Sequence, residues 1–227
     1  MSRARPVVAI DGPAGSGKST AARRLADRLG FVLVDTGALY RGVALAARER
    51  GLAWDDGEAV GDLARSLHLD FEMENGTPRL RFGGRDREDD IRTAGIAQGA
   101  SLVSRHPQVR AALLDQQRRF GDHGGVVLEG RDIGTVVFPD AEVKVFLRAA
   151  PEERARRRTE ELRERGQPAD YERTLAEIRR RDDQDEGRAV APLRAADDAV
   201  VLDTTALTPD QVVDRLEALV RARMKAP

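Results

Sequence analysis

The residues best suited to chemistry lie near the N-terminus, where a glycine-rich segment ends in a lysine and a hydroxyl side chain. Residues 12–19 read GPAGSGKS and fit the phosphate-binding pattern G-x-x-x-x-G-K-[ST] in full. In this pattern, glycines let backbone N–H groups converge on an anion, and the lysine contacts the β- and γ-phosphates. The serine hydroxyl is expected to ligate the Mg²⁺ that accompanies ATP. The predicted ATP-binding residues are Gly12, Pro13, Ala14, Gly15, Ser16, Gly17, Lys18, Ser19 and Thr20, with Ser19 as the metal ligand and Lys18 as a catalytic residue.

Arginines also follow two of the predicted strands, within residues 35–41 (DTGALYR) and 129–135 (EGRDIGT). In open α/β sheets, ligands bind at the carboxyl ends of strands, so Arg41 and Arg131 are expected to face one crevice beside the glycine-rich loop. Two guanidinium forks there suit a dianionic phosphate. The sequence therefore predicts an acceptor substrate that carries a phosphate group.

A third charged segment, residues 179–188, reads RRRDDQDEGR. Arg181, Asp185 and Arg188 are spaced i, i+4 and i+7, which puts them on one helix face if the helix continues through Arg188. A solvated helix with charge pairs four residues apart is the alternative interpretation. The first interpretation makes these three residues part of the substrate site.

The arginines just before this segment, among them Arg157 and Arg158, raise the question of a nucleic-acid patch. Residues 152–186 contain ten arginines but twelve acidic residues, and a net-negative segment is a poor binder of polyanions. A mobile lid fits better, because closure over the site would keep water away from the phosphoryl group during transfer. We therefore expect no nucleic-acid partner and expect Arg157 and Arg158 to act from a lid.

The elements that must position these residues alternate along the chain. Apolar runs typical of buried strands occur at residues 6–10, 31–37, 125–128, 143–147 and 199–202. Helical spacing of apolar residues occurs at 18–29, 38–50, 108–120, 151–166, 171–185 and 209–223, the last with Thr208 as N-cap and Pro209 as first residue. This alternation predicts an α/β P-loop fold with a five-stranded parallel sheet flanked by helices.

Residues 62–106 depart from the alternation. Residues 69–73 and 79–82 alternate between apolar and polar residues on either side of Asn75-Gly76, a strong hairpin signal. We therefore expect residues 62–106 to form an inserted domain, small, antiparallel β and helical. The remaining chain is expected to form a P-loop core (1–61, 107–151 and 190–227) and a helical lid (152–189).

Composition narrows the possible function classes. The 227 residues include no cysteine, which excludes disulfides and cysteine nucleophiles, and the net charge is −1, which argues against polyanion binding. No apolar stretch reaches the roughly 18 residues of a membrane span, and no secretory signal is evident, so we expect no membrane partner and a cytoplasmic location. Of the 38 basic residues, 35 are arginine, so Lys18 stands out.

Among P-loop proteins, several classes do not fit. The chain has no NKxD motif, which a guanine-specific GTPase needs, and it is short for a motor or helicase. A kinase for a small acceptor remains. A regulatory nucleotide-binding protein without transfer activity is the rival from another class, and the acceptor-side arginines argue against it.

The motifs together resemble those of the bacterial-type cytidylate kinases. The matching stretches are VVAIDGPAGSGKST, VDTGALYR, EDDIRT, VVLEGRDIGTVVFPDA, EERARRR and RRDDQDEGRAVAPL, from residue 7 to about 203. The resemblance implies phosphoryl transfer from ATP, with Mg²⁺, to CMP or dCMP, and it makes residues 62–106 the region that binds the nucleoside monophosphate. We expect the protein to be a monomer. Family members often have Ser at the position of Thr36 and usually Asp at that of Glu129.

The resemblance also implies roles for single residues. Thr36 and Tyr40 would line the CMP pocket, and the CMP phosphate would be held by Arg41, Arg92 and Arg131. Arg110 and Asp132 would recognise cytosine. Ribose and base would be contacted by Arg181, Asp185 and Arg188, while Arg131, Arg157 and Arg158 would join Lys18 in catalysis.

The base assignment has a physical basis in the chemistry of cytosine. Its exocyclic amino group donates to a carboxylate, whereas the carbonyl of uracil at that position would be repelled by one. Asp132 would therefore favour CMP over UMP, and Arg110 could donate to the acceptors of the base. A P-loop kinase for UMP or AMP is the remaining alternative.

Overall fold

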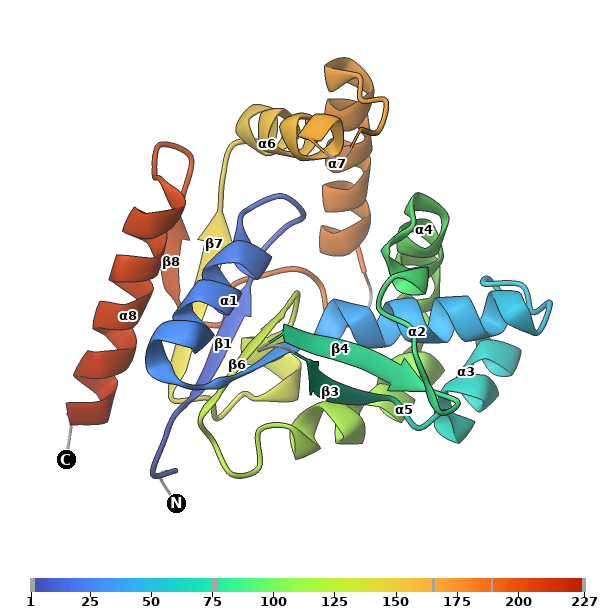
Figure 1. Cartoon of the computed structure of the whole chain (residues 1–227), viewed down its shortest axis with the longest axis horizontal. Coiled ribbons are helices and arrows are strands. Elements are labelled where there is room, and N and C mark those ends of the chain that lie inside the picture. Colours follow the sequence, from blue (N-terminus) through green and yellow to red (C-terminus); the bar gives the residue numbers. More distant parts are fainter. Residues whose placement is uncertain (1–2, 75–76, 165, 189, 226–227) are drawn as a thin grey trace. The chain divides into compact units, whose positions relative to one another are not determined.

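The computed structural model describes residues 3–74, 77–164, 166–188 and 190–225, and the chain forms two compact units (Figure 1). Unit 1 comprises Met1–Leu33 and His123–Pro227, and unit 2 comprises Val34–Asp122. Each unit buries a cluster of apolar side chains of its own.

Unit 1 is built on a five-stranded sheet in the order β2-β6-β1-β7-β8, of which the last two residues of β2, Val34 and Asp35, are counted with unit 2. Its strands are β1 (Val7–Asp11), β2 (Val32–Asp35), β6 (Val126–Gly130), β7 (Val143–Arg148) and β8 (Val200–Asp203). β1 pairs in parallel with β6 and β7, so that Val8 lies opposite Val127 and Val143, and β7 pairs in parallel with β8. The predicted parallel sheet is confirmed, and its strand ends differ from the predicted ones by at most two residues.

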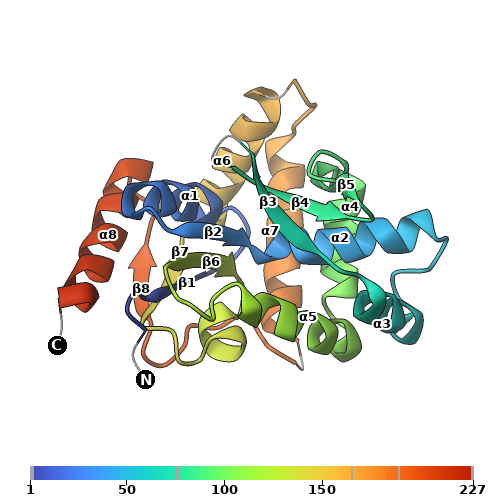
Figure 2. The same cartoon turned by 60° about the horizontal axis from the view of Figure 1, so that its bottom comes forward.

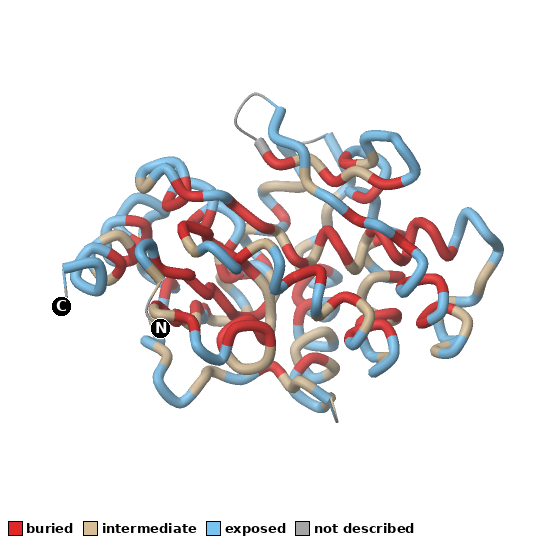
Figure 3. The backbone as a smooth tube through the Cα atoms, turned by 90° about the horizontal axis from the view of Figure 1, so that it is seen from below, coloured by how far each residue is buried: buried red, intermediate tan, exposed pale blue. Residues whose placement is uncertain are grey.

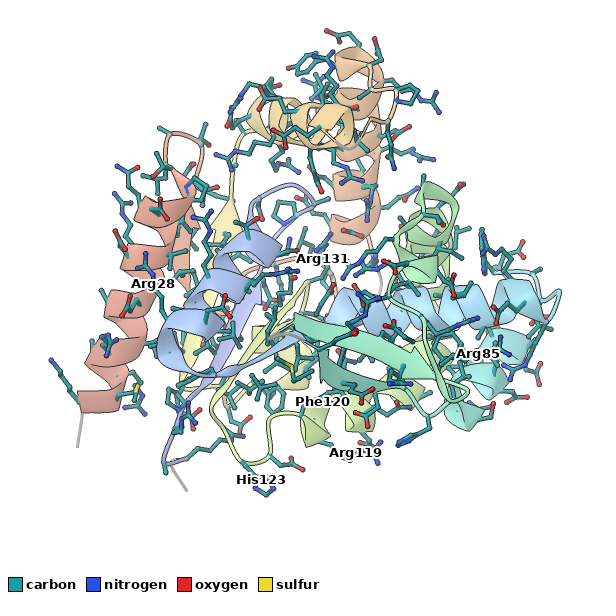
Figure 4. All side chains as sticks on the ribbon, in the orientation of Figure 1. Arg28, Arg85, Arg119, Phe120, His123 and Arg131 are labelled. Carbon is teal, nitrogen blue, oxygen red and sulfur yellow. The ribbon has the colours of Figure 1, made fainter. Side chains whose placement is uncertain are left out.

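Two helices of unit 1, α1 (Lys18–Leu29) and α8 (Pro209–Lys225), pack against each other and against strands of this sheet. Their buried apolar faces complete the core, and Figure 3 shows the segment that leads to the C-terminus with buried residues first and exposed residues at its end. On the outer side, Arg28 of α1 donates to Asp214 and Glu217 of α8 at 2.6 and 3.1 Å (Figure 4). The core and this ion pair hold α1, and with it the loop that precedes α1.

The start of α8 is fixed by a reciprocal pair of hydrogen bonds. The Thr208 hydroxyl accepts from the N–H of Gln211 at 3.3 Å, and the Gln211 side chain accepts from the N–H of Thr208 at 3.0 Å. This arrangement satisfies N–H groups that have no partner within the helix. The predicted N-cap at Thr208 is therefore confirmed.

The helices α6 (Pro151–Glu164) and α7 (Tyr171–Glu186) pack on each other beyond the end of β7 (Figure 1). Their contact includes a small apolar cluster of Ala155, Leu175 and Ile178. α7 begins at Asp170, whose carboxylate accepts from the N–H of Arg173 at 2.8 Å. Both predicted helices are present, and α7 ends at Glu186, so the helix does not continue through Arg188.

Unit 2 combines helices with a small antiparallel sheet. Its elements are α2 (Thr36–Glu49), α3 (Gly57–Ser66), β3 (Asp70–Glu74), β4 (Thr77–Phe82), β5 (Arg85–Asp86), a 3-10 turn (Asp90–Arg92), α4 (Ala94–Val103) and α5 (Pro107–Arg119). α2 packs on α4, and α3 packs on α5. The core of unit 2 lies between these helices and β4, and it includes Leu39, Val43, Leu80, Ile96 and Leu113.

The predicted hairpin is formed by β3 and β4, which lie side by side in Figure 2. β5 pairs with the end of β4 and makes the sheet three-stranded. The turn predicted at Asn75-Gly76 lies outside the described residues. Just before β3, the side chain of Gln116 donates to the carbonyl of Leu67 and accepts from the N–H of Leu69, which ties the hairpin to α5.

Among the described residues, five elements were given no bounds by the sequence: α3, β5, the 3-10 turn, α4 and a single-turn π-helix over Ile133–Val137 that follows β6. α2 begins two residues earlier than predicted, because Asp35 caps it by accepting from the N–H of Ala38 at 3.2 Å. Among the described residues, no helix is long and apolar enough to cross a membrane.

Candidate functional site

The loop between β1 and α1 has the backbone of an anion-binding site (Figure 1). α1 begins at Lys18, directly after Gly17, which has φ 90°. Gly12 has φ 147°, and a Cβ there would lie 2.0 Å from the carbonyl oxygen of Leu147, so only glycine fits. The first turn of α1 carries no acidic side chain, which leaves its N-terminal partial charge available to an anion.

Lys18 is buried at this loop, with 6% of its surface exposed. Its Nζ donates to the carbonyl of Pro13 at 2.7 Å, so the lysine spans the loop. Burial, followed by the charge of Arg131, lowers the pKa of Lys18 to about 7, while nearby carboxylates, with Glu129 foremost, oppose that shift. An anion bound in the loop would favour the charged lysine.

Ser19 and Glu129 form the best candidate for a metal site. The Ser19 hydroxyl donates to Oε2 of Glu129 at 2.8 Å, which joins the start of α1 to the end of β6. Glu129 is 5% exposed. Hydroxyl and carboxylate oxygens are the donors that Mg²⁺ prefers, so the two residues fit this ion. No larger cluster of acidic residues or histidines suited to a metal occurs in the described part of the chain.

Arg131 follows β6 and lies beside the end of α7 (Figure 4). Its Nε donates to Oδ2 of Asp185 at 3.0 Å, and Asp185 also accepts from Arg188. Burial alone would raise the pKa of Asp185, but the charges of Arg131, Arg188 and Arg181 outweigh burial and hold it below its ordinary value. The three residues predicted to act together, Arg181, Asp185 and Arg188, are thus joined electrostatically even though α7 ends before Arg188.

The two arginines assigned to a lid differ in their surroundings. Arg157 of α6 donates to the carbonyl of Thr204 at 2.6 Å, and a Cβ at Gly17 would lie 3.9 Å from its Nη1. Arg158 instead pairs with Glu161 on the exposed side of α6 at 2.7 Å. The structure therefore brings Arg157, but not Arg158, to the glycine-rich loop.

In unit 2, two of the predicted phosphate-binding arginines converge on one carboxylate. Asp35 accepts from Arg41 at 2.6 Å and from Arg92 at 3.2 Å. Burial opposes ionisation of Asp35, yet the charges of Arg41 and Arg92 outweigh it and hold its pKa below the ordinary value. Arg92 also donates through Nε to Glu88 at 2.7 Å. Both guanidinium groups are therefore held in place by carboxylates.

Thr36, Tyr40 and Arg110 lie in the same unit. Thr36 is the first residue of α2 and is 3% exposed. The Arg110 guanidinium lies 5.7 Å from the ring centroid of Tyr40 and donates to the carbonyl of Ser104 at 3.4 Å. This stacking holds a buried cation against an aromatic face.

The predicted site residues thus divide between the units. Unit 1 holds the glycine-rich loop with Arg131, Asp132, Arg157, Arg158, Arg181, Asp185 and Arg188; unit 2 holds Thr36, Tyr40, Arg41, Arg92 and Arg110. Sequence reasoning gave no role to Glu129 or Asp35, although both stand at the end of a predicted strand. That position is the signal that could have found them.

Comparison with known proteins gives a consistent result over nearly the whole chain. The family model described as "Cytidylate kinase" matches residues 8–222. The chain is 51% identical over 220 residues to the "Cytidylate kinase" of Geobacter sulfurreducens, covering 97% of this chain and 94% of that protein. It is 46% identical over 213 residues to the "Cytidylate kinase" of Aeromonas salmonicida, covering 94% and 93%. A solved structure, an uncharacterized protein from Eubacterium ventriosum, aligns with a TM-score of 0.54 at 12% identity, covering 96% of this chain and 99% of that one, and supports the fold alone.

Proposed function

Because the chain belongs to the cytidylate kinase family, it is a nucleoside monophosphate kinase, and we propose that it transfers the γ-phosphoryl group of ATP to CMP or dCMP. The products are ADP and CDP or dCDP. The family match over residues 8–222 carries this proposal. The buried Lys18 and the glycine-rich loop before α1 support the ATP half of the reaction.

ATP binds, in this proposal, through its phosphates to the N–H groups of residues 12–20 and to Lys18. The loop and the start of α1 provide N–H donors and partial positive charge for them. Ser19 and Glu129 would hold Mg²⁺, whose charge neutralises the triphosphate when it is bound. The contact between Lys18 and the Pro13 carbonyl would give way to contacts with phosphate oxygens.

The phosphate of CMP is bound, in this proposal, by Arg41, Arg92 and Arg131, with bidentate guanidinium geometry as the physical reason. Thr36 and Tyr40 line the nucleotide pocket. Asp185, with Arg181 and Arg188, contacts ribose and base.

Cytosine is recognised by Arg110 and Asp132 in this proposal. The Asp132 carboxylate accepts from the exocyclic amino group, and Arg110 donates to the acceptors of the ring. The cation–π contact of Arg110 with Tyr40 supports this role, because it keeps the cation beside a residue of the proposed nucleotide pocket. Residues 62–106 serve as the monophosphate-binding insert.

Transfer needs alignment and charge neutralisation rather than a covalent intermediate. Lys18, Arg131 and Arg157 supply positive charge around the phosphoryl group as it moves. Arg158, which pairs with Glu161 away from the loop, would join them only when the lid closes. Residues 152–189 act as a lid that excludes water, so that ATP is not lost to hydrolysis. The enzyme acts as a cytoplasmic monomer, with no nucleic-acid or membrane partner.

A coupled ADP-release assay tests the proposal, with ATP, Mg²⁺ and, separately, CMP, dCMP, UMP and AMP. Strong turnover with CMP and dCMP alone is the expected result. Turnover with UMP or AMP instead would support phosphoryl transfer but refute the recognition of cytosine. ATP binding without turnover of any acceptor would favour a regulatory protein.

A further inference from the structure

Asp11 is a buried carboxylate outside the residues that are proposed to bind ATP or CMP. It is the last residue of β1, directly before Gly12, and only 4% of its surface is exposed. Both of its oxygens accept backbone hydrogen bonds: Oδ1 from the N–H of Ile133 and Oδ2 from the N–H of Gly134, each at 2.8 Å. These partners open the single-turn π-helix that follows β6.

The first N–H groups of a helix have no acceptor within the helix itself. At Ile133 and Gly134, Asp11 supplies that acceptor from a neighbouring strand. The carbonyl of Asp132 meanwhile accepts from the N–H groups of Val136 and Val137 at 2.9 and 3.3 Å. The turn is therefore anchored both within itself and to β1.

The position of Arg131 and Asp132 follows from these anchors. In the register of β1 and β6, Asp11 lies opposite Gly130, so the sheet fixes the backbone just before Arg131. The Asp11 side chain fixes the backbone just after Asp132. Arg131 and Asp132 thus lie between Gly130 and Ile133, and the end of β1 holds the backbone at both of these residues.

A carboxylate is needed for this arrangement. It offers an acceptor oxygen to each N–H group, whereas the amide of asparagine has one acceptor oxygen and an NH₂ group that cannot accept. Burial is the main influence on Asp11 and raises its pKa to about 6, while the N–H groups of Gly134 and Ile133, together with Lys18, favour the ionised form. The two N–H groups therefore help to keep a charged side chain in a buried position.

We propose that Asp11 is a positioning residue for the acceptor nucleotide: through the N–H groups of Ile133 and Gly134, it fixes where Arg131 and Asp132 present their side chains to CMP. This inference rests on the proposed function, which assigns Arg131 to the phosphate of CMP and Asp132 to its base. A general effect on the glycine-rich loop is the rival explanation, because Asp11 precedes Gly12.

Asp11→Asn tests the inference, because it preserves size and removes one acceptor. We expect kcat/KM for CMP to fall about tenfold to a hundredfold, because small misplacements of binding groups have effects of this size. We also expect the ratio of kcat/KM for CMP to kcat/KM for UMP to decrease. The Kd for ATP, from equilibrium binding, is expected to stay at the wild-type value. The inference would be overturned if ATP binding were weakened by the same factor as kcat/KM for CMP. It would also be overturned if the variant kept wild-type kinetics with CMP.

Glu142→Gln is the matched control. Glu142 also accepts from two backbone N–H groups, those of Val7 at 2.9 Å and Arg3 at 3.3 Å, but at the opposite end of β1. We expect this variant to keep wild-type kinetics for CMP and UMP. A loss of CMP selectivity in Glu142→Gln as well would refute a specific role for Asp11.

Amide hydrogen exchange on the wild-type enzyme tests the anchor without any variant. Slow exchange at Ile133 and Gly134 is expected, and exchange as fast as in an open loop would overturn the inference even if Asp11→Asn fails to fold. The wild-type acceptor assay separates the two proposals. Better turnover of UMP or AMP than of CMP refutes the base assignment before Asp11 is examined.

Discussion

The guanidinium of Arg154 and the carboxylate of Asp182 form a two-pronged ion pair between α6 and α7, with N–O distances of 3.0 and 2.6 Å. The Arg154 side chain is 4% exposed, and it also donates to the carbonyls of Ala149 at 2.9 Å and Ala14 at 3.1 Å. Ala14 belongs to the glycine-rich loop. One buried side chain therefore joins both helices of the expected lid to the loop expected to hold ATP.

Arg154→Met is expected to destabilise unit 1 and to raise the KM for ATP. The variant leaves Asp182 without its buried partner, and breaking such a pair by removing one member costs about 3 to 5 kcal/mol. Urea denaturation followed by circular dichroism measures the stability, and initial rates at varied ATP measure the KM. Arg156→Met, which removes an exposed arginine paired with Glu153 and Glu160, is the control and is expected to change neither. An unaltered KM in Arg154→Met would contradict the link to the loop.

Asp35→Asn is expected to lower the stability of unit 2 at neutral pH and to make that stability less dependent on pH in acid. Because Arg41 and Arg92 hold the pKa of Asp35 below its ordinary value, ionised Asp35 contributes stability above about pH 4, and this is lost as the pH falls through the folded-state pKa. The free energy of unfolding of the variant should be lower than that of the wild type by about 1 to 3 kcal/mol at pH 7. It should also decrease less as the pH is lowered. Fluorescence of Trp54, the single tryptophan of the chain, reports unfolding of unit 2.

The matched control for Asp35 is Asp62→Asn in the same unit. Asp62 pairs with Arg65 on the exposed side of α3, where an ion pair contributes little. Its acid unfolding curve is expected to overlay that of the wild type. If the acid unfolding curve of Asp35→Asn also overlays that of the wild type, the ion pairs of Asp35 with Arg41 and Arg92 do not contribute to the stability of unit 2.

Glu129→Gln is expected to raise the Mg²⁺ concentration needed for half-maximal activity. The substitution keeps the hydrogen-bond acceptor for Ser19 but removes the negative charge that attracts the ion. Activity is titrated with Mg²⁺ at constant free ATP, and ATP binding without Mg²⁺ is measured separately. An unchanged Mg²⁺ requirement would exclude Glu129 from the metal site.

Asp132→Ala is expected to narrow the preference for CMP over UMP. Loss of one base-specific contact of this kind costs roughly 1–3 kcal/mol of discrimination, which is about tenfold to more than a hundredfold. The ratio of kcat/KM for the two nucleotides is the measurement, and Asp140→Ala, at an exposed aspartate beyond the π-helix, is the control. An unchanged ratio would refute the role of Asp132.

The sequence alone was sufficient to predict those parts of the fold and of the candidate site that a local pattern determines. The motif of residues 12–19, the five strands and the cap at Thr208 all depend on neighbours along the chain. The pairing of Ser19 with Glu129 and of Asp11 with Ile133 and Gly134 depends instead on β1 and β6 being adjacent, which no local pattern encodes. α3 was missed for a different reason, since it is only ten residues long and its short apolar face spans residue 62, where the predicted insert begins.

The division of the chain has a consequence for its synthesis. Unit 2 is one continuous stretch with its whole core inside residues 34–122, so its partners emerge from the ribosome together. β1 emerges first, but its neighbours β6 and β7 follow only after unit 2 has been made. We therefore expect unit 2 to fold while the chain is still growing, as continuous domains generally do. During that interval the apolar residues of β1, all buried in the finished protein, have no partner strand.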